Sequence, residues 1–162
     1  MSSINVVMSF KSILVSSLLI AILPATILIL SELLLTKSVS STGLWVSIVL
    51  FFFLQGYVVF QGVSGRVSLE NEKLKVRSGF YSATWPSKEL QIVNEEAVGL
   101  ANSIRVNGVA MYGLRAGWFR VAAKDIFVLA TTDERLCLAQ GSKVVVCLDR
   151  EVVERLKQNY GL

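Results

Sequence analysis

The sequence predicts an α+β membrane protein: a two-helix transmembrane hairpin, then an antiparallel β-sandwich or barrel of about seven strands with a C-terminal capping helix. Three observations predict this fold class. Long apolar runs lie near the N-terminus, short alternating apolar and polar runs follow, and the last residues change to a helical period. We therefore divide the chain into an N-terminal tail with a membrane hairpin (residues 1–65) and a β domain (residues 66–162).

The membrane hairpin is predicted from two apolar runs, which cover about residues 13–35 and 44–63. A helix rises ~1.5 Å per residue, so a run of about 20 residues matches the ~30 Å hydrocarbon core of a bilayer. Lipid offers no partners to backbone polar groups, and helix is therefore the expected state of both runs. The polar link between them is short, which predicts an antiparallel pair. Pro24, in the middle of the first run, predicts a kink.

A cleaved signal peptide is the alternative interpretation of the first run. The run is longer than the ~7–15 residues of a signal core, and Lys11 is the only basic side chain before it. Both features favour a retained membrane span.

The orientation of the hairpin is predicted from basic residues near the span ends. Lys37 is alone in the link, whereas Arg66, Lys73, Lys75 and Arg77 follow the second run. Cytoplasmic loops carry an excess of Lys and Arg, so both termini are expected in the cytoplasm. Of the 16 basic and 12 acidic side chains of the chain, most lie from Arg66 onward, where the two signs are interspersed. Nucleic-acid binding is not expected, because it calls for a clustered basic face.

Polar side chains within the runs raise a second possibility. Glu32 is an ionisable group near the outer end of the first run, where it can reach the membrane surface and serve a structural role. Alternatively, helix hairpins that associate could line a transport pathway or channel with Glu32, Gln55 or Gln61.

The β domain is predicted from short strand-like segments between residues 67 and 148, separated by turn signals. Pro86 is expected to end one strand, and Asn107-Gly108 is a strong turn signal. Asp149 is expected to be the N-cap of the last helix, which ends at Gly161. Its apolar residues recur at helical spacing and are expected to close the open end of the sheets: Val152, Val153, Leu156 and Tyr160.

The two cysteines, Cys137 and Cys147, lie in apolar strand segments of the predicted cytoplasmic domain. We expect buried, reduced thiols, with a disulfide as the alternative that reversed topology would favour. The chain has no His and no Cys pair at ligand spacing, so neither a metal site nor a cofactor is expected. No nucleophile with a base and no facing carboxylate pair is evident, which argues against an enzyme. An enzyme would need an acid pair in a cleft.

The domain resembles the bacterial membrane-associated PH-like (pleckstrin-homology-fold) family. The resemblance rests on Ile104-Arg105-Val106-Asn107-Gly108, then Gly113, then Ala116-Gly117-Trp118-Phe119. It implies a PH-like domain attached to membrane spans, in a bacterial plasma (inner) membrane. The start of the last helix, Leu148-Asp149-Arg150-Glu151, departs from the family pattern because it lacks the usual proline. The first hairpin mixes basic and acidic residues, which does not favour specific phosphoinositide binding.

The candidate partner-binding residues are Arg105, Arg115, Trp118 and Arg120, because Arg and Trp are enriched at binding hot spots. The alternative is that Trp118 and Phe119 are core residues and the arginines are solvated. The expected function is a non-enzymatic, membrane-anchored interaction module or an accessory subunit of a membrane assembly. Its expected partners are the lipid bilayer and an unidentified membrane or cytoplasmic protein, or a second copy of the chain.

Overall fold

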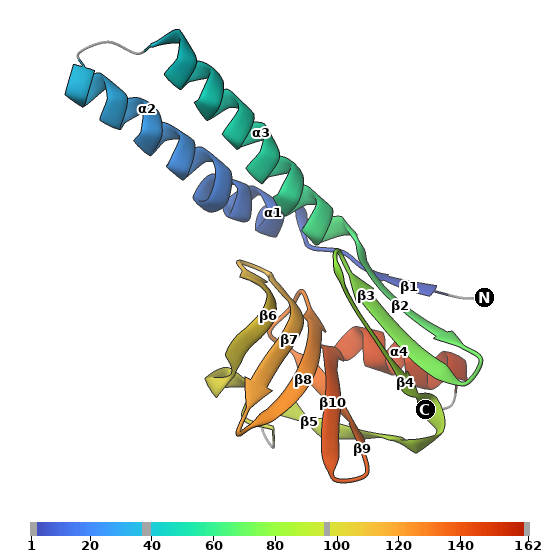
Figure 1. Ribbon diagram of the computed structural model, residues 1–162. Helices are drawn as coiled ribbons and strands as arrows, with labels where there is room; N and C mark the ends of the chain where they lie inside the picture. The colour runs from blue at the N-terminus through green and yellow to red at the C-terminus, as the bar shows by residue number, and fades with distance from the viewer. Residues whose placement is uncertain (1–2, 37–39, 96–97, 161–162) are drawn as a thin grey trace.

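The computed structural model describes residues 3–36, 40–95 and 98–160. It is an α+β structure in which a pair of long helices projects from one side of a β domain (Figure 1). The two helical spans, Phe10–Leu35 and Ser41–Val63, are long and apolar enough to cross a membrane. Each begins three residues before the start predicted from the apolar runs, because polar serines open both helices.

The first span is not a continuous α-helix. It consists of α1 (Phe10–Ser17), a π-helical segment (Leu18–Ile22) and α2 (Leu23–Thr36), and it pairs with α3 (Ser41–Val63). The π-helical segment ends at Ile22, directly before Leu23 and Pro24. Proline has no N–H to donate to the preceding turn, and a π-bulge is a common way to absorb that defect. The structure therefore shows a change of helical type beside Pro24, and the predicted kink itself stays a prediction.

An N-terminal strand joins the tail to the β domain. β1 (Ser3–Val6) pairs antiparallel with β2 (Gly65–Glu70), with Ile4 opposite Val67. From the sequence this segment was expected to be only a tail. Because β2 follows α3 directly, the strand pairing brings the start of the chain and the β domain to the same end of the helix hairpin (Figure 1).

The described strands number ten, more than the predicted seven, and form two sheets. The first has the order β1-β2-β3-β4, and the second has the order β5-β9-β10-β8-β7-β6. All strand pairs are antiparallel except β8 and β10, because β10 returns between β8 and β9. The bounds not yet given are β3 (Lys73–Ser78), β4 (Tyr81–Pro86), β5 (Leu90–Asn94), β6 (Ile104–Met111), β7 (Leu114–Val121), β8 (Lys124–Ala130), β9 (Arg135–Gln140) and β10 (Lys143–Asp149).

The second sheet is buried on both faces. On one face Phe127 and Leu129 of β8 pack against Leu74 and Val76 of the first sheet, and on the other Ile126 packs beneath the 98–103 segment. The burial explains why the β8 sequence is continuously apolar rather than alternating. The helix α4 (Arg150–Tyr160) covers the first of these cores. As predicted, its apolar stripe is buried, at Val152, Val153 and Leu156. The expected contribution of Tyr160 and the end at Gly161 lie outside the described side chains and residues.

Two local predictions are corrected. Asn107-Gly108 is not a turn, because both residues lie within β6, and the chain turns instead at Gly113, whose φ is +70°. Gly108 faces Gly117 across β6 and β7, where a side chain on either residue would overlap the opposite backbone. The second correction concerns Asp149, whose carboxylate binds another loop, as described below. Pro86 ends β4 as predicted.

Candidate functional site

The four predicted partner-binding residues lie on β6 and β7 but do not share one face. Side chains alternate along a strand, so Arg115 projects from the face of β7 opposite Trp118 and Arg120. Arg105 is exposed on the neighbouring edge strand β6. Arg120 is bound to Asp125, with 2.7 Å between Nε and Oδ1. This hydrogen bond holds the pKa of Asp125 below its ordinary value and raises that of Arg120.

Trp118 belongs to an aromatic cluster between the two sheets. Its ring centroid lies 5.3 Å from that of Phe127 and 6.3 Å from that of Trp85. Phe119, on the opposite face, is 3% exposed. The packing interpretation is therefore confirmed for the buried Phe119, whereas Trp118 is only partly buried and its role in partner binding stays a prediction. A role of the arginines in partner binding stays a prediction.

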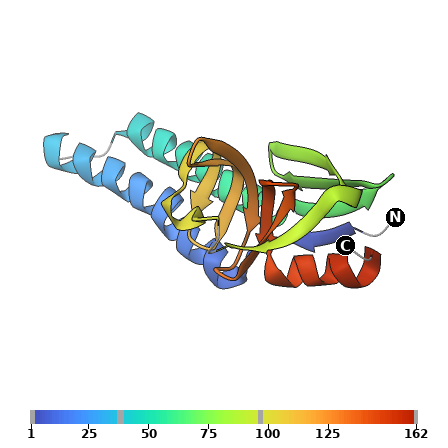
Figure 2. The ribbon, with the colours of Figure 1, turned by 90° about the horizontal axis from the view of Figure 1, so that it is seen from below.

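A surface cleft lies elsewhere on the domain. It has a volume of about 650 Å³ and is bounded by β1, by the loop between β8 and β9, and by the first two turns of α4. Figure 2 shows β1 lying alongside α4 at this part of the domain. The cleft could not be predicted from the sequence. β1 was not predicted, and the residues that line the cleft come from segments more than 120 residues apart.

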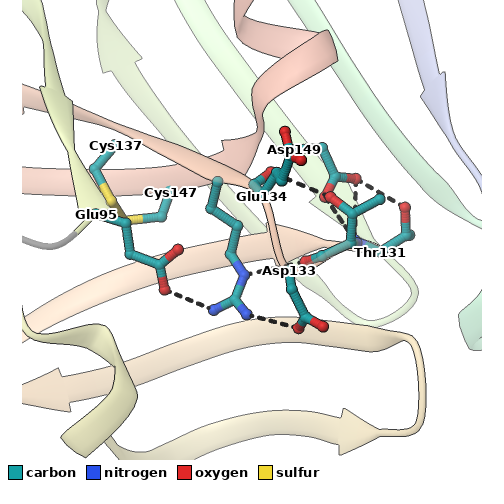
Figure 3. Close-up of polar contacts among 9 residues, drawn as sticks. Glu95, Thr131, Asp133, Glu134, Cys137, Cys147 and Asp149 are labelled. Atoms are coloured by element: carbon teal, nitrogen blue, oxygen red, sulfur yellow. Dashed lines mark hydrogen bonds and ion pairs between the residues drawn. A yellow bond between two sulfur atoms is a disulfide. The ribbon is translucent and has the colours of Figure 1, made fainter.

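Asp149 fixes the floor of the cleft and is 5% exposed. Its carboxylate accepts hydrogen bonds from the backbone N–H groups of Thr131 and Thr132, each at 2.9 Å, and from both threonine hydroxyls at 2.8 Å (Figure 3). This network ties the β8–β9 loop to the end of β10. It also replaces the N-cap role predicted for the Asp149 side chain.

Arg135 holds the other side of the same loop. Its side chain is 8% exposed, and it donates to Glu95 at 3.0 Å, to Asp133 at 3.3 Å and to the carbonyl of Thr132 at 3.1 Å. The Thr132–Arg135 run was interpreted only as a separator between strands, with Thr131 as the last residue of the preceding strand. The two threonines before Asp133 and Glu134 were the available signal of a structured loop.

Several carboxylates that line the cleft are engaged by donors within the protein. Asp149 is saturated by four donors, and Glu134 and Glu151 form ion pairs with Arg150 and Arg155. A general base needs a free lone pair directed at substrate, and Asp149 offers none. Among the described residues there is no group of His, Cys, Asp and Glu side chains suited to hold a metal ion.

The expectation of reduced thiols is wrong for this structure. Cys137 and Cys147 form a disulfide, with 2.00 Å between the sulfur atoms. They are direct register partners on β9 and β10, and both are fully buried in the second core. The alternation of each strand could be predicted, but the pairing of these two strands could not.

The polar side chains of the spans are engaged within the hairpin or buried against the domain. Glu32 accepts hydrogen bonds from the backbone N–H and the hydroxyl of Ser40, at the N-terminus of α3. Gln55 donates to Ser17 across the helix pair at 3.0 Å. Gln61 is fully buried against Gly79, the turn between β3 and β4.

Comparisons with protein-family models, with curated proteins and with solved structures find no match to this chain.

Proposed function

We propose that the chain is a membrane-anchored, non-enzymatic interaction module that binds a protein partner, as an accessory subunit of a membrane assembly. The observation that carries the proposal is the cleft between β1 and α4. A volume of about 650 Å³ is within the range of specific binding sites. The pleckstrin-homology resemblance is part of the proposal. Two packed sheets followed by a helix agree with it, while the parallel β8–β10 pair departs from an antiparallel arrangement.

The mode of binding follows from the position of β1. It is the edge of its sheet, and one side of the strand has no strand partner among the described residues. Exposed sheet edges bind extended peptides by adding a strand, with backbone hydrogen bonds giving affinity. An extended segment of the partner that lies along β1 would occupy the cleft and contact α4.

The charge of the cleft indicates which segment fits. Carboxylates outnumber guanidinium groups on its walls, and Glu154 has no ion pair with any described residue. Electrostatic complementarity sets specificity and speeds encounter. We therefore assign the cleft to a basic, extended segment of the partner.

The location proposed is a bacterial plasma membrane, with both termini and the β domain in the cytoplasm. The excess of basic residues after the second span supports this orientation. The disulfide opposes it, because disulfides are rare in cytosolic proteins. A reporter fusion decides between the two, as argued in the Discussion.

The test is affinity purification of the full-length tagged protein from native membranes in mild detergent. We expect a stoichiometric partner that is retained by the wild type and reduced at least tenfold in Glu154→Arg, because the reversed charge repels a basic segment. Glu72→Arg, in the exposed β2–β3 turn, is the matched control and should retain the partner.

Two further variants separate the candidate surfaces. Loss of the partner in Arg105→Glu/Arg115→Glu but not in Glu154→Arg would move the binding surface to β6 and β7. Recovery of the protein alone, as an oligomer unaffected by all these changes, would contradict the proposal. That outcome would favour the alternative of a transport or channel component built from associated helix hairpins.

A further inference from the structure

A second groove lies where the β domain meets the membrane. It has a volume of about 420 Å³ and is lined by the end of α3, by the start of β2 and by β3. We call it the basic groove, because three of the side chains that line it are cations: Arg66, Lys75 and Arg77. All three side chains are exposed, and none forms an ion pair or side-chain hydrogen bond with a described residue.

The positions of these cations are electrostatically unfavourable in the protein alone. Arg66 and Arg77 are direct register partners on β2 and β3, and Lys75 lies one pair further along the same face. Like charges directly opposite each other destabilise a strand pair. The outer neighbours in the Arg66–Arg77 row are Asn5 and Ser82, which supply no compensating carboxylate. A bound anion would relieve this repulsion.

The depth of the groove matches that of lipid headgroups. The second span ends at Val63, three residues before Arg66, and Val63 and Phe60 form the apolar end of the groove. Phe80, at the β3–β4 turn, is 75% exposed, and its ring lies 5.1 Å from that of Phe60. Figure 1 shows this turn directed at the end of α3. Exposed aromatic rings of this kind are typical of the membrane interface.

The groove is therefore apolar towards the bilayer and cationic away from it. Ser64 adds a hydroxyl group beside the cations. Glu70 is the acidic residue of the groove, and it lies at the far end, where it is the register partner of Lys73 and accepts from Ser68 at 3.4 Å. The arrangement fits a phospholipid whose acyl chain and glycerol contact Phe60 and Val63, and whose phosphate accepts hydrogen bonds from the guanidinium groups.

We propose that the basic groove binds the phosphate headgroup of an anionic phospholipid from the adjacent leaflet. The site lies at the membrane end of the β2–β3 hairpin, away from the Glu70–Lys73 loop. It requires no protein partner, and it would fix the rotation of the β domain on the membrane surface.

The test uses the full-length protein in nanodiscs of phosphatidylcholine, with or without phosphatidylglycerol, and counts retained lipids by native mass spectrometry. We expect the wild type to retain phosphatidylglycerol preferentially. Each cation near the surface contributes about fivefold to the affinity for anionic lipid, so Arg66→Gln/Arg77→Gln should bind it about 25-fold more weakly. Lys124→Gln/Lys143→Gln removes the same charge at turns directed away from the hairpin, and should bind like wild type.

Thermal unfolding in the same nanodiscs gives a second readout. In phosphatidylcholine alone the Arg66→Gln/Arg77→Gln variant should be at least as stable as wild type, because the repulsion is gone. With phosphatidylglycerol only the wild type and the control should gain stability. Absence of a lipid preference in the wild type, or an equal loss in the control variant, would overturn the proposal. Equal stabilisation by inorganic phosphate in phosphatidylcholine would assign the groove to free phosphate instead.

Discussion

Asp149 is the residue on which the shape of the cleft depends most directly. Its buried carboxylate satisfies two backbone N–H groups and two hydroxyls of Thr131 and Thr132. Removal of a buried acceptor leaves its donors unsatisfied, which costs more than the net value of the hydrogen bonds. The same carboxylate joins the end of β10 to the β8–β9 loop, so the proposed binding surface and the fold depend on the same group.

We predict that Asp149→Ala lowers the free energy of unfolding by about 3 kcal/mol, because several buried donors lose one charged acceptor. Thermal or chemical unfolding of the detergent-solubilised protein measures this. Glu154→Ala, on the exposed face of α4, should change stability by less than about 0.5 kcal/mol. Equal effects of the two substitutions would show that the Asp149 network is not formed.

Gln61 is also a buried polar residue, but unlike Asp149 it is unsatisfied among the described residues. Neither of its amide atoms has a hydrogen-bond partner in the described part of the chain, and its side chain fills the space beside Gly79. We predict that Gln61→Met leaves stability unchanged or raises it by about 1 kcal/mol, because an unsatisfied amide is replaced by an apolar group of similar volume. Unfolding of the two proteins in the same detergent measures this.

Gly79→Ala provides the control, because its Cβ would overlap the Gln61 amide and its φ is +54°. It should destabilise the wild type more than it destabilises a Gln61→Ala background, in which the overlap is absent. If Gln61→Met proves strongly destabilising, the amide has a partner that the described contacts do not include.

At the scale of elements, local sequence signals predicted the spans and most strands but not their pairing. The alternation and turn residues near Lys73, Pro86 and Asp149 were sufficient for β3, β4 and α4. β1 was missed because a four-residue strand is defined only by its partner, about 60 residues away. The turn predicted at Asn107-Gly108 was wrong because a glycine within a strand also allows the backbone of the next strand to approach closely, here at Gly117.

The candidate site was predicted less well than the fold, for the same reason. The proposed cleft lies between segments that are distant in sequence, and the basic groove combines residues 60–79 with Asn5 and Val7 of the N-terminal segment, whereas the predicted residues were neighbours along the chain. A tryptophan such as Trp118 is typical both of packed cores and of binding surfaces, and no local sequence pattern distinguishes the two roles.

The N-terminal strand should be more than a tail, because it forms the edge that the proposed partner would use. Ile4→Pro removes a backbone donor and strains the pairing with Val67. We predict that amide hydrogen exchange in β2 then rises about tenfold, while exchange in β9 and β10 is unchanged. Asn5→Ala, an exposed position on the same strand, should leave exchange as in wild type. Unchanged protection of β2 in Ile4→Pro would mean that β1 does not stabilise this edge.

The disulfide is predicted to stabilise the second core. It closes a loop between residues separated by 10 positions, and Cys137→Ala/Cys147→Ala should lower the free energy of unfolding of the air-oxidised protein by about 2–3 kcal/mol. Reductant should lower the stability of the wild type towards that of the variant and leave the variant unaffected. A wild type whose stability does not respond to reductant under unfolding conditions would contradict the bond.

At the scale of the whole molecule, two observations give opposite orientations. Basic residues after the second span favour a cytoplasmic β domain, and the disulfide favours an oxidising compartment. The β1–β2 pairing limits the choice to two topologies, because the N-terminal strand and the β domain must share one side.

We predict the cytoplasmic orientation, because the basic cluster lies within a few residues of the span end, where the charge rule is strongest. In bacteria, green fluorescent protein fused to the C-terminus should then be fluorescent, and alkaline phosphatase fused at the same position should be inactive. In this orientation the disulfide of the structure would form only on extraction, and alkylation of denatured protein taken directly from cells would then label both cysteines.

The opposite pair of results, active phosphatase and unlabelled cysteines, would place the β domain on the outer side. The basic groove would then face the outer leaflet, and the partner of the cleft would be an extracytoplasmic protein. Active phosphatase with labelled cysteines would show that the thiols remain reduced on the oxidising side, and would remove the disulfide as an argument about orientation. The thiol measurement and the fusion therefore have to be made on the same cells.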